Sequence, residues 1–162
     1  MAGLAATVAL FPLAAGAETY WDKLEWQVRP LVLVEGGTHS DREADHDADH
    51  WVKRLEADRC ALAERRIHWL VIDADGAVWR RFDGSDGSEF EATQLDRAAA
   101  DVVRDRLGWS RGDPSRLVLF GLDGQEKYRG RPDALQTIWS LIDRMPMRRT
   151  ELAREPDDCG GR

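Results

Sequence analysis

The chain has 162 residues, a length typical of one globular domain with short tails. Its 23 basic and 30 acidic residues give a formal net charge of −7. Because binding to phosphates depends on clustered lysine and arginine, this charge argues against a nucleic-acid partner. With 43% hydrophobic residues, the chain can bury a core without disulfide support.

Residues 1–17, MAGLAATVALFPLAAGA, contain no charged side chain and end in an Ala-x-Ala cleavage pattern. We interpret this segment as a signal peptide, with a buried N-terminal helix as the alternative. No later segment is long and apolar enough to cross a bilayer. The sequence therefore predicts a mature chain that is periplasmic or secreted and has no membrane span.

A polar lead-in segment (18–29) precedes the first strand, the apolar and β-branched run at 31–35. Ser40 and Glu43 have the spacing of a capping box at a helix start. Apolar residues then recur at intervals of three and four, which predicts one helix over about 41–66.

The middle of the chain predicts a hairpin followed by a helix. The buried strand at 67–73 and the alternating strand at 77–82 are separated by an Asp-Gly turn. The polar segment 83–89 is typical of a loop. A second amphipathic helix is predicted over 93–107, with Gly108 as its C-terminal cap.

Residues 117–130 predict a second hairpin, again with an Asp-Gly turn. The last helix begins near residues 131–133 and ends at Pro146, and residues 151–162 are predicted to be disordered. Interleaved helices and strands over residues 30–150 predict an α/β three-layer sandwich. Its mixed sheet has about four to five strands with helices on both faces, an order that resembles the thioredoxin fold.

The sequence also resembles a known family. Residues 117–149, LVLFGLDGQEKYRGRPDALQTIWSLIDRMPMRR, are similar to the C-terminal signature of domain of unknown function 4174 (DUF4174), which ends in an ID-MPMRR segment. The Arg-Pro-Leu-Val run at 29–32 also fits this family. The resemblance covers about residues 26–150, and the loop at 83–89 resembles an insertion.

This resemblance implies a thioredoxin-like fold with a peroxiredoxin-like ancestry. It also implies export, because the bacterial members resemble exported proteins and the animal relatives are extracellular matrix proteins. It carries over no established catalytic residue.

A thioredoxin-type redox centre would lie directly after the first strand, where helix amides stabilise a thiolate. The corresponding positions hold His39, Ser40, Asp41 and Arg42. A peroxiredoxin would have its cysteine three residues after a threonine, but the residue three positions after Thr38 is Asp41. A thioredoxin fold also has a cis-proline directly before its third strand, and Ser115 occupies that position. We therefore interpret this segment as a vestigial redox position without cysteine.

The two cysteines of the chain are Cys60 and Cys159. Cys60 is predicted to point outward from the middle of the first helix, where no exposed amide would activate a thiolate. In an oxidising compartment two such cysteines can pair, so we predict a Cys60–Cys159 disulfide. Two free thiols, or an intermolecular bridge through Cys159, remain open as alternatives.

A metal site is the remaining chemical candidate. His46 and His50 are four residues apart, so both could bind one ion on a helix, with His39 as a further ligand. Their helical-wheel positions, however, lie opposite the apolar stripe, on a solvent face. We therefore expect no metal and no other cofactor.

These observations favour a binding or structural module that is not an enzyme and that has an unidentified protein partner. Two alternatives stay open: a divergent peroxiredoxin-like oxidoreductase, and a zinc-binding protein that uses His39, His46 and His50.

Overall fold

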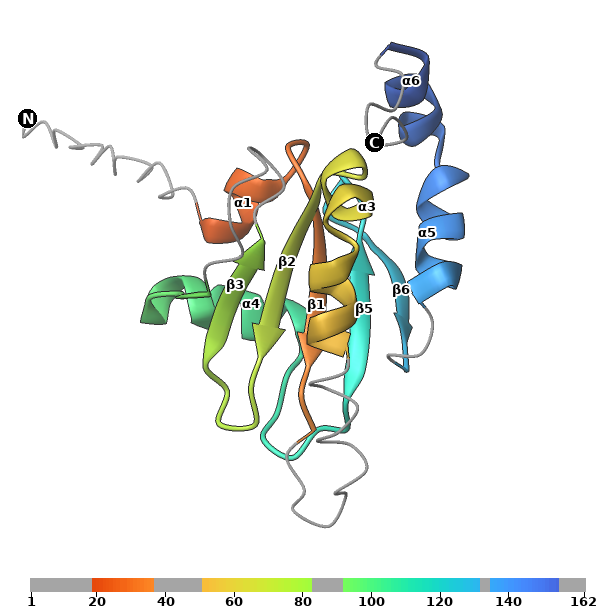
Figure 1. Cartoon of the computed structure of the whole chain (residues 1–162). Coiled ribbons are helices and arrows are strands. Elements are labelled where there is room, and N and C mark those ends of the chain that lie inside the picture. Colours follow the sequence, from red (N-terminus) through yellow and green to blue (C-terminus); the bar gives the residue numbers. More distant parts are fainter. Residues whose placement is uncertain (1–18, 37–50, 83–91, 132–134, 155–162) are drawn as a thin grey trace, which may run out of the picture.

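The computed structural model describes residues 19–36, 51–82, 92–131 and 135–154. The strands are β1 (Arg29–Val34), β2 (Ile67–Ile72), β3 (Val78–Phe82), β4 (Thr93–Gln94), β5 (Arg116–Phe120) and β6 (Glu126–Gly130) (Figure 1). The helices are α1 (Tyr20–Leu24), α3 (Arg59–Glu64), α4 (Arg97–Leu107), α5 (Leu135–Asp143) and α6 (Pro146–Arg154). Residues 51–57 are helical as well.

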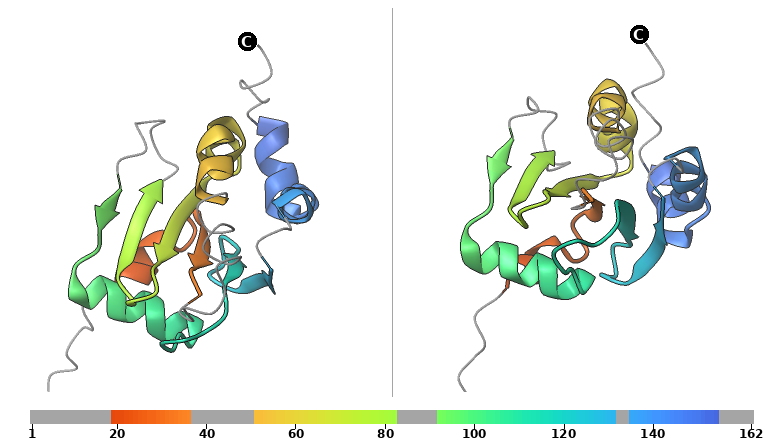
Figure 2. Two further views of the ribbon diagram at one scale, coloured as in Figure 1. Left: turned by 60° about the horizontal axis from the view of Figure 1, so that its bottom comes forward. Right: turned by 90° about the horizontal axis from the view of Figure 1, so that it is seen from below.

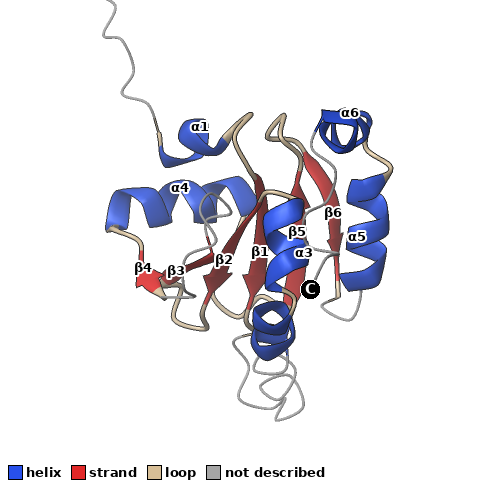
Figure 3. Ribbon diagram, turned by 45° about the horizontal axis from the view of Figure 1, so that its top comes forward, coloured by secondary structure: helices blue, strands red, loops and turns tan. Residues whose placement is uncertain are grey.

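The described strands form one sheet in the order β4-β3-β2-β1-β5-β6 (Figure 3). β1 and β2 are parallel, and all other neighbouring pairs are antiparallel. The predicted mixed sheet is therefore confirmed, but the predicted count of four to five strands is wrong because the sheet has six. The unpredicted strand is β4, which pairs with β3.

β1 and β2 form the centre of the sheet because both are continuous apolar runs. Every residue of the two strands is buried, as expected for parallel strands covered on both faces. β1 begins at Arg29, before the predicted start. The backbone N–H of Arg29 donates to the carbonyl oxygen of Arg66 at 2.7 Å. This strand pairing places a charged residue in the interior of the domain.

Helices cover both faces of the sheet, as predicted (Figure 2). Residues 51–57, α3 and α5 cover one face, and α1 and α4 cover the other. The helical residues of the first core are Trp51, Leu55, Leu62, Leu135, Ile138, Trp139 and Ile142, and those of the second are Trp21, Ala100, Val103 and Leu107.

The helix predicted over 41–66 is interrupted at Asp58. This residue departs from helical backbone geometry (φ −103°, ψ 33°), and α3 begins after it. Oδ2 of Asp58 accepts a hydrogen bond from Nε1 of Trp139 at 3.1 Å. A buried indole N–H needs such a partner, so a contact with the distant helix α5 accounts for the interruption. The predicted residues before Trp51 lie outside the described part of the helix.

The helix predicted over 93–107 begins later than expected. Thr93 and Gln94 pair with β3 instead, and Asp96 caps α4 by accepting a hydrogen bond from the N–H of Ala99 at 2.9 Å. Gly108 ends the helix with a φ of 60°, which confirms the predicted cap.

The lead-in segment contains a helix that the sequence does not predict. Thr19 and Asp22 form a capping box at the start of α1, with reciprocal hydrogen bonds of 2.9 Å and 3.2 Å. Trp21 packs in the core. Trp26, in contrast, is 56% exposed and has a φ of 63°.

The end of the chain also differs from the prediction. Pro146 follows α5 and is also the first residue of a further helix, α6. A proline at this position costs little because its missing N–H would have no partner within the helix. Residues 151–154, predicted to be disordered, are helical. Among the helices that the structure describes, none combines the length and the apolar character needed to cross a bilayer.

Candidate functional site

Most of the predicted site residues lie outside the described part of the chain. These are His39, Ser40, Asp41, Arg42, His46, His50 and Cys159. Within the described residues, no group of three or more potential metal ligands occurs. The vestigial redox position, the zinc alternative and the Cys60–Cys159 bridge therefore stay predictions.

Cys60 is the predicted site residue that the structure does describe. It is exposed on α3, as its wheel position predicted. Because the helix is interrupted at Asp58, Cys60 lies in the first turn of a short helix, so its expected mid-helix position is wrong. No described cysteine is a free thiol. Cys60 therefore offers no thiolate here, although the first turn of a helix is where backbone amides can stabilise one.

The carboxyl end of β1 is a candidate site because ligands of α/β sheets bind at such strand ends. Here the backbone N–H of Gly36 donates to Oγ of Ser115 at 2.8 Å. A Cβ atom at Gly36 would lie 2.8 Å from the same oxygen, so the close approach requires glycine. In its described part, this strand end is therefore closed by a serine from the loop before β5.

Asp113 braces the loop that carries Ser115. Its Oδ2 accepts hydrogen bonds from the backbone N–H of Ser110 at 3.0 Å and from Nη2 of Arg116 at 2.8 Å. The Ser110 hydrogen bond lowers the pKa of Asp113, burial partly offsets this effect, and Arg116 lowers the pKa further. Asp113 is therefore ionised at neutral pH and holds the loop in place rather than donating a proton.

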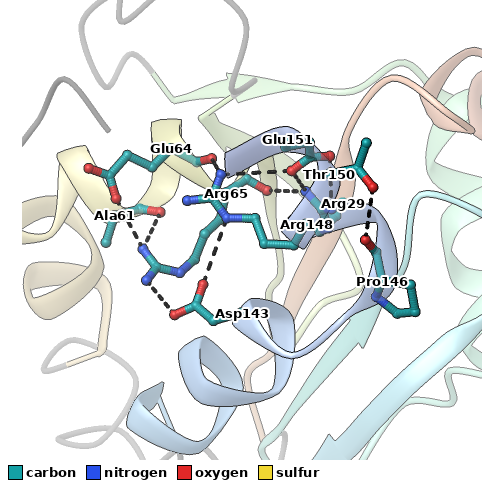
Figure 4. Close-up of polar contacts among 9 residues, drawn as sticks. All are labelled: Arg29, Ala61, Glu64, Arg65, Asp143, Pro146, Arg148, Thr150 and Glu151. Atoms are coloured by element: carbon teal, nitrogen blue, oxygen red, sulfur yellow. Dashed lines mark hydrogen bonds and ion pairs between the residues drawn. The ribbon is translucent and has the colours of Figure 1, made fainter. Parts of the chain in front are cut away.

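A second candidate is a group of three arginines and three carboxylates at the start of β1, of which Arg29 and Arg148 are buried (Figure 4). This arginine cluster consists of Arg29, Glu64, Arg65, Asp143, Arg148 and Glu151. At its centre, the side chain of Arg29 is 1% exposed. Its Nη1 and Nη2 donate to the two carboxylate oxygens of Glu151 at 3.2 Å and 3.0 Å. Such two-pronged pairs are the most specific arginine–carboxylate contacts.

Arg65 connects the cluster to α5. Its Nη2 donates to Oδ2 of Asp143 at 2.8 Å, and its guanidinium carbon lies 5.4 Å from the ring centroid of Trp139. The carbonyl oxygen of Arg65 also accepts a hydrogen bond from Nη1 of Arg29 at 2.9 Å. The end of α3, the start of β1 and the end of α5 are thereby joined.

Arg148 brings α6 into the same cluster. Arg148 is 4% exposed, and its Nη1 donates to the carbonyl oxygen of Glu64 at 2.7 Å. The guanidinium also lies 3.8 Å from the carboxylates of Asp143 and Glu151. These contacts satisfy a charge that would otherwise be costly to bury.

The arginine cluster is suited to holding elements together. Its guanidinium groups and carboxylates balance (3 − 3 = 0), so the group has no excess positive charge for an anionic ligand. A ligand would have to displace a carboxylate already in place, and breaking a buried pair costs about 3–5 kcal/mol.

The sequence does not reveal the arginine cluster. In the sequence, Arg148 and Arg149 follow the predicted helix end at Pro146, a position where the dipole would favour cations. The structure contradicts this interpretation. Both residues lie in the first turn of α6, the end that disfavours cations. The sequence did contain one indication of the arginine cluster, because Arg29, Asp143 and Arg148 all belong to the segments that resemble DUF4174.

Comparison with known proteins identifies a family over most of the chain. Residues 21–151 match the family described as Domain of unknown function (DUF4174). No curated protein and no solved structure matches the chain. The matched range includes every residue of the arginine cluster, so the resemblance seen at both ends of the domain is confirmed. The chain belongs to the DUF4174 family.

Proposed function

We propose that this protein is an exported, thioredoxin-like domain without a redox centre, which acts as a binding or structural module. The consecutive strands β2-β1-β5-β6 support the thioredoxin-like part, because a parallel pair is followed by an antiparallel hairpin. β3 and β4 extend this unit beyond β2. The helices on both faces agree with the same arrangement (Figure 2).

The contact between Gly36 and Ser115 carries the non-redox part of the proposal. Thioredoxin-type catalysis needs a thiolate near this strand end, and the chain has cysteine only at Cys60 and Cys159. In the described residues, Cys60 lies on α3 and a serine faces the end of β1. Such a domain retains a scaffold for recognition but lacks a dithiol for electron transfer.

Insulin-reduction and peroxide-turnover assays test the absence of redox activity. The wild type is compared with Cys60→Ser and with the matched variant Cys159→Ser. We expect no turnover by the wild type above that of either variant. Turnover that Cys60→Ser abolishes would overturn the non-redox proposal.

The proposed compartment and the Cys60–Cys159 bridge support each other. Residues 1–17 have the pattern of a signal peptide, and cysteines of exported proteins commonly pair. A bridge closing a loop of about 100 residues would stabilise the fold by about 2–4 kcal/mol. In the denatured protein we expect no titratable thiol before reduction and both thiols afterwards. A disulfide-linked dimer on a non-reducing gel would instead indicate an intermolecular bridge.

Export itself is tested by cell fractionation and by the mass of the mature chain. We expect the protein in the extracytoplasmic fraction with Glu18 as its first residue. A cytoplasmic protein that retains residues 1–17 would contradict this part of the proposal.

Crosslinked capture from the extracytoplasmic fraction tests the binding role. The wild type is compared with the double variant Cys60→Ser/Cys159→Ser. A partner that both proteins retain equally would support a binding module. A partner that only the wild type retains, and that reductant releases, would indicate thiol exchange and contradict the proposal.

A further inference from the structure

α6 is attached to the domain with very little apolar burial. Among residues 146–153, Arg148 is the buried residue, while Met147 is 42% exposed and Leu152 is half-buried. Neither of the two cores contains a described residue of α6. Because hydrophobic stabilisation scales with buried apolar area, at about 25 cal/mol per Å², this term contributes little to the docking of α6.

Ionic contacts hold α6 instead (Figure 4). The Glu151 carboxylate accepts hydrogen bonds from Nη2 and Nη1 of Arg29, at 3.0 Å and 3.2 Å. Arg148 bonds the carbonyl oxygen of Glu64 at 2.7 Å. Both anchoring side chains of α6 therefore reach groups outside the helix, on β1 and at the end of α3.

Opening of α6 would leave the rest of the domain intact. The sheet and its two cores contain no described residue of α6. Without Glu151, Arg29 would keep its hydrogen bond to the carbonyl oxygen of Arg65. The Glu151 side chain is 21% exposed, so the pair lies at the edge of the domain, where local opening below the energy of global unfolding occurs.

We infer that α6 is a latch that opens as a separate unit, and that Glu151 is the residue that keeps it closed. In the closed state, the Glu151 carboxylate occupies the guanidinium of Arg29. The inference depends only on the docking of α6 and is independent of the proposed non-redox function.

Hydrogen exchange of the full chain, read by mass spectrometry, tests the latch. Glu151→Gln is compared with Glu126→Gln, which also removes a carboxylate from an arginine pair but on the exposed strand β6. In Glu151→Gln we expect the protection of residues 146–154 to fall at least about tenfold, because α6 loses its main anchor. The protection of α5 and β1 should stay within about twofold of the wild type, and Glu126→Gln should leave α6 unchanged.

Two results would overturn the inference. Equal loss of protection in α5 and α6 would show that α6 does not open separately, and unchanged protection in α6 would show that Glu151 does not hold it. If Glu151→Gln fails to fold, Glu151→Asp provides the test. This variant keeps the charge but shortens the side chain, so its carboxylate cannot reach both Nη atoms of Arg29 as that of Glu151 does. The protection of α6 should then fall relative to α5, and a constant ratio would refute the latch.

Discussion

α5 and α6 follow one another in the chain and each has nine residues, but different forces hold them. α5 buries four apolar side chains, Leu135, Ile138, Trp139 and Ile142, against one face of the sheet. α6 buries a charged one, Arg148, and pairs Glu151 with Arg29. Apolar burial depends on area and tolerates small shifts, whereas an arginine–carboxylate fork depends on geometry and charge. The comparison shows that one domain can hold two neighbouring helices by different kinds of contact.

The largest difference between the helices should appear on loss of apolar volume. Ile142→Ala opens a cavity in the core beneath α5 and should lower the free energy of unfolding by about 2–5 kcal/mol. Met147→Ala removes an exposed side chain from α6 and should change this free energy by less than about 0.5 kcal/mol. Urea denaturation measures the free energy of unfolding of both variants. Equal losses in the two variants would show that α5 and α6 do not differ in their dependence on apolar packing.

A double-mutant cycle tests the ionic attachment of α6. Arg29→Met and Glu151→Met each strip a partner from the buried pair, whereas the double variant leaves two apolar side chains. We expect the effects of the single variants to be non-additive, with a coupling energy of about 1–3 kcal/mol from urea denaturation. Additive effects would show that the pair contributes nothing specific to the closed state.

Asp58→Ala separates the polar contact of α5 from its apolar packing. The variant keeps the Trp139 ring but removes the carboxylate that accepts the hydrogen bond from Nε1. We expect a loss of about 1 kcal/mol, because Asp58 is only half-buried and water can replace the acceptor. Thermal unfolding of Asp58→Ala beside Asp58→Asn, which keeps an acceptor oxygen, would check this value. A loss as large as that of Ile142→Ala would mean that α5 also depends on polar contacts.

A small effect is also expected for an ion pair on the surface. The hydrogen bond from Arg129 lowers the pKa of Glu126, which burial partly offsets, so this pair adds stability above the unfolded pKa of about 4.3 and loses it as pH falls through the lower folded value. Glu126→Gln should cost less than about 1 kcal/mol near neutral pH, because both side chains are more than one-third exposed. Wild type and variant should converge in stability once the pH falls below the lowered pKa of Glu126. A larger cost than that of Glu151→Gln would reverse the expected order of exposed and buried pairs.

The best sequence predictions concern elements with a single strong pattern. The apolar runs of β1 and β2 and the glycine cap of α4 lie where the sequence predicts them, because burial and a positive φ leave clear residue preferences. The errors occur where a distant partner overrides local preference. Asp58 interrupts a periodic helix to meet Trp139, and Thr93 leaves a predicted helix to pair with β3.

The candidate sites follow the same division. The absence of a cysteine after β1 is visible in the sequence, whereas the contact of Gly36 with Ser115 joins residues that are far apart in the chain. Arg29 and Glu151 are separated by 122 positions, so no local pattern indicates that they form a pair.

The sequence by itself determined the family, the α/β class and the apolar faces, because periodicity and local motifs are properties of neighbouring residues. Only the tertiary structure decided that the Arg-Pro and MPMRR segments meet in one cluster, in which Arg29 and Arg148 are buried. Buried charges are stabilised by partners at particular distances and angles, and these distances exist only once β1, α3, α5 and α6 have come together.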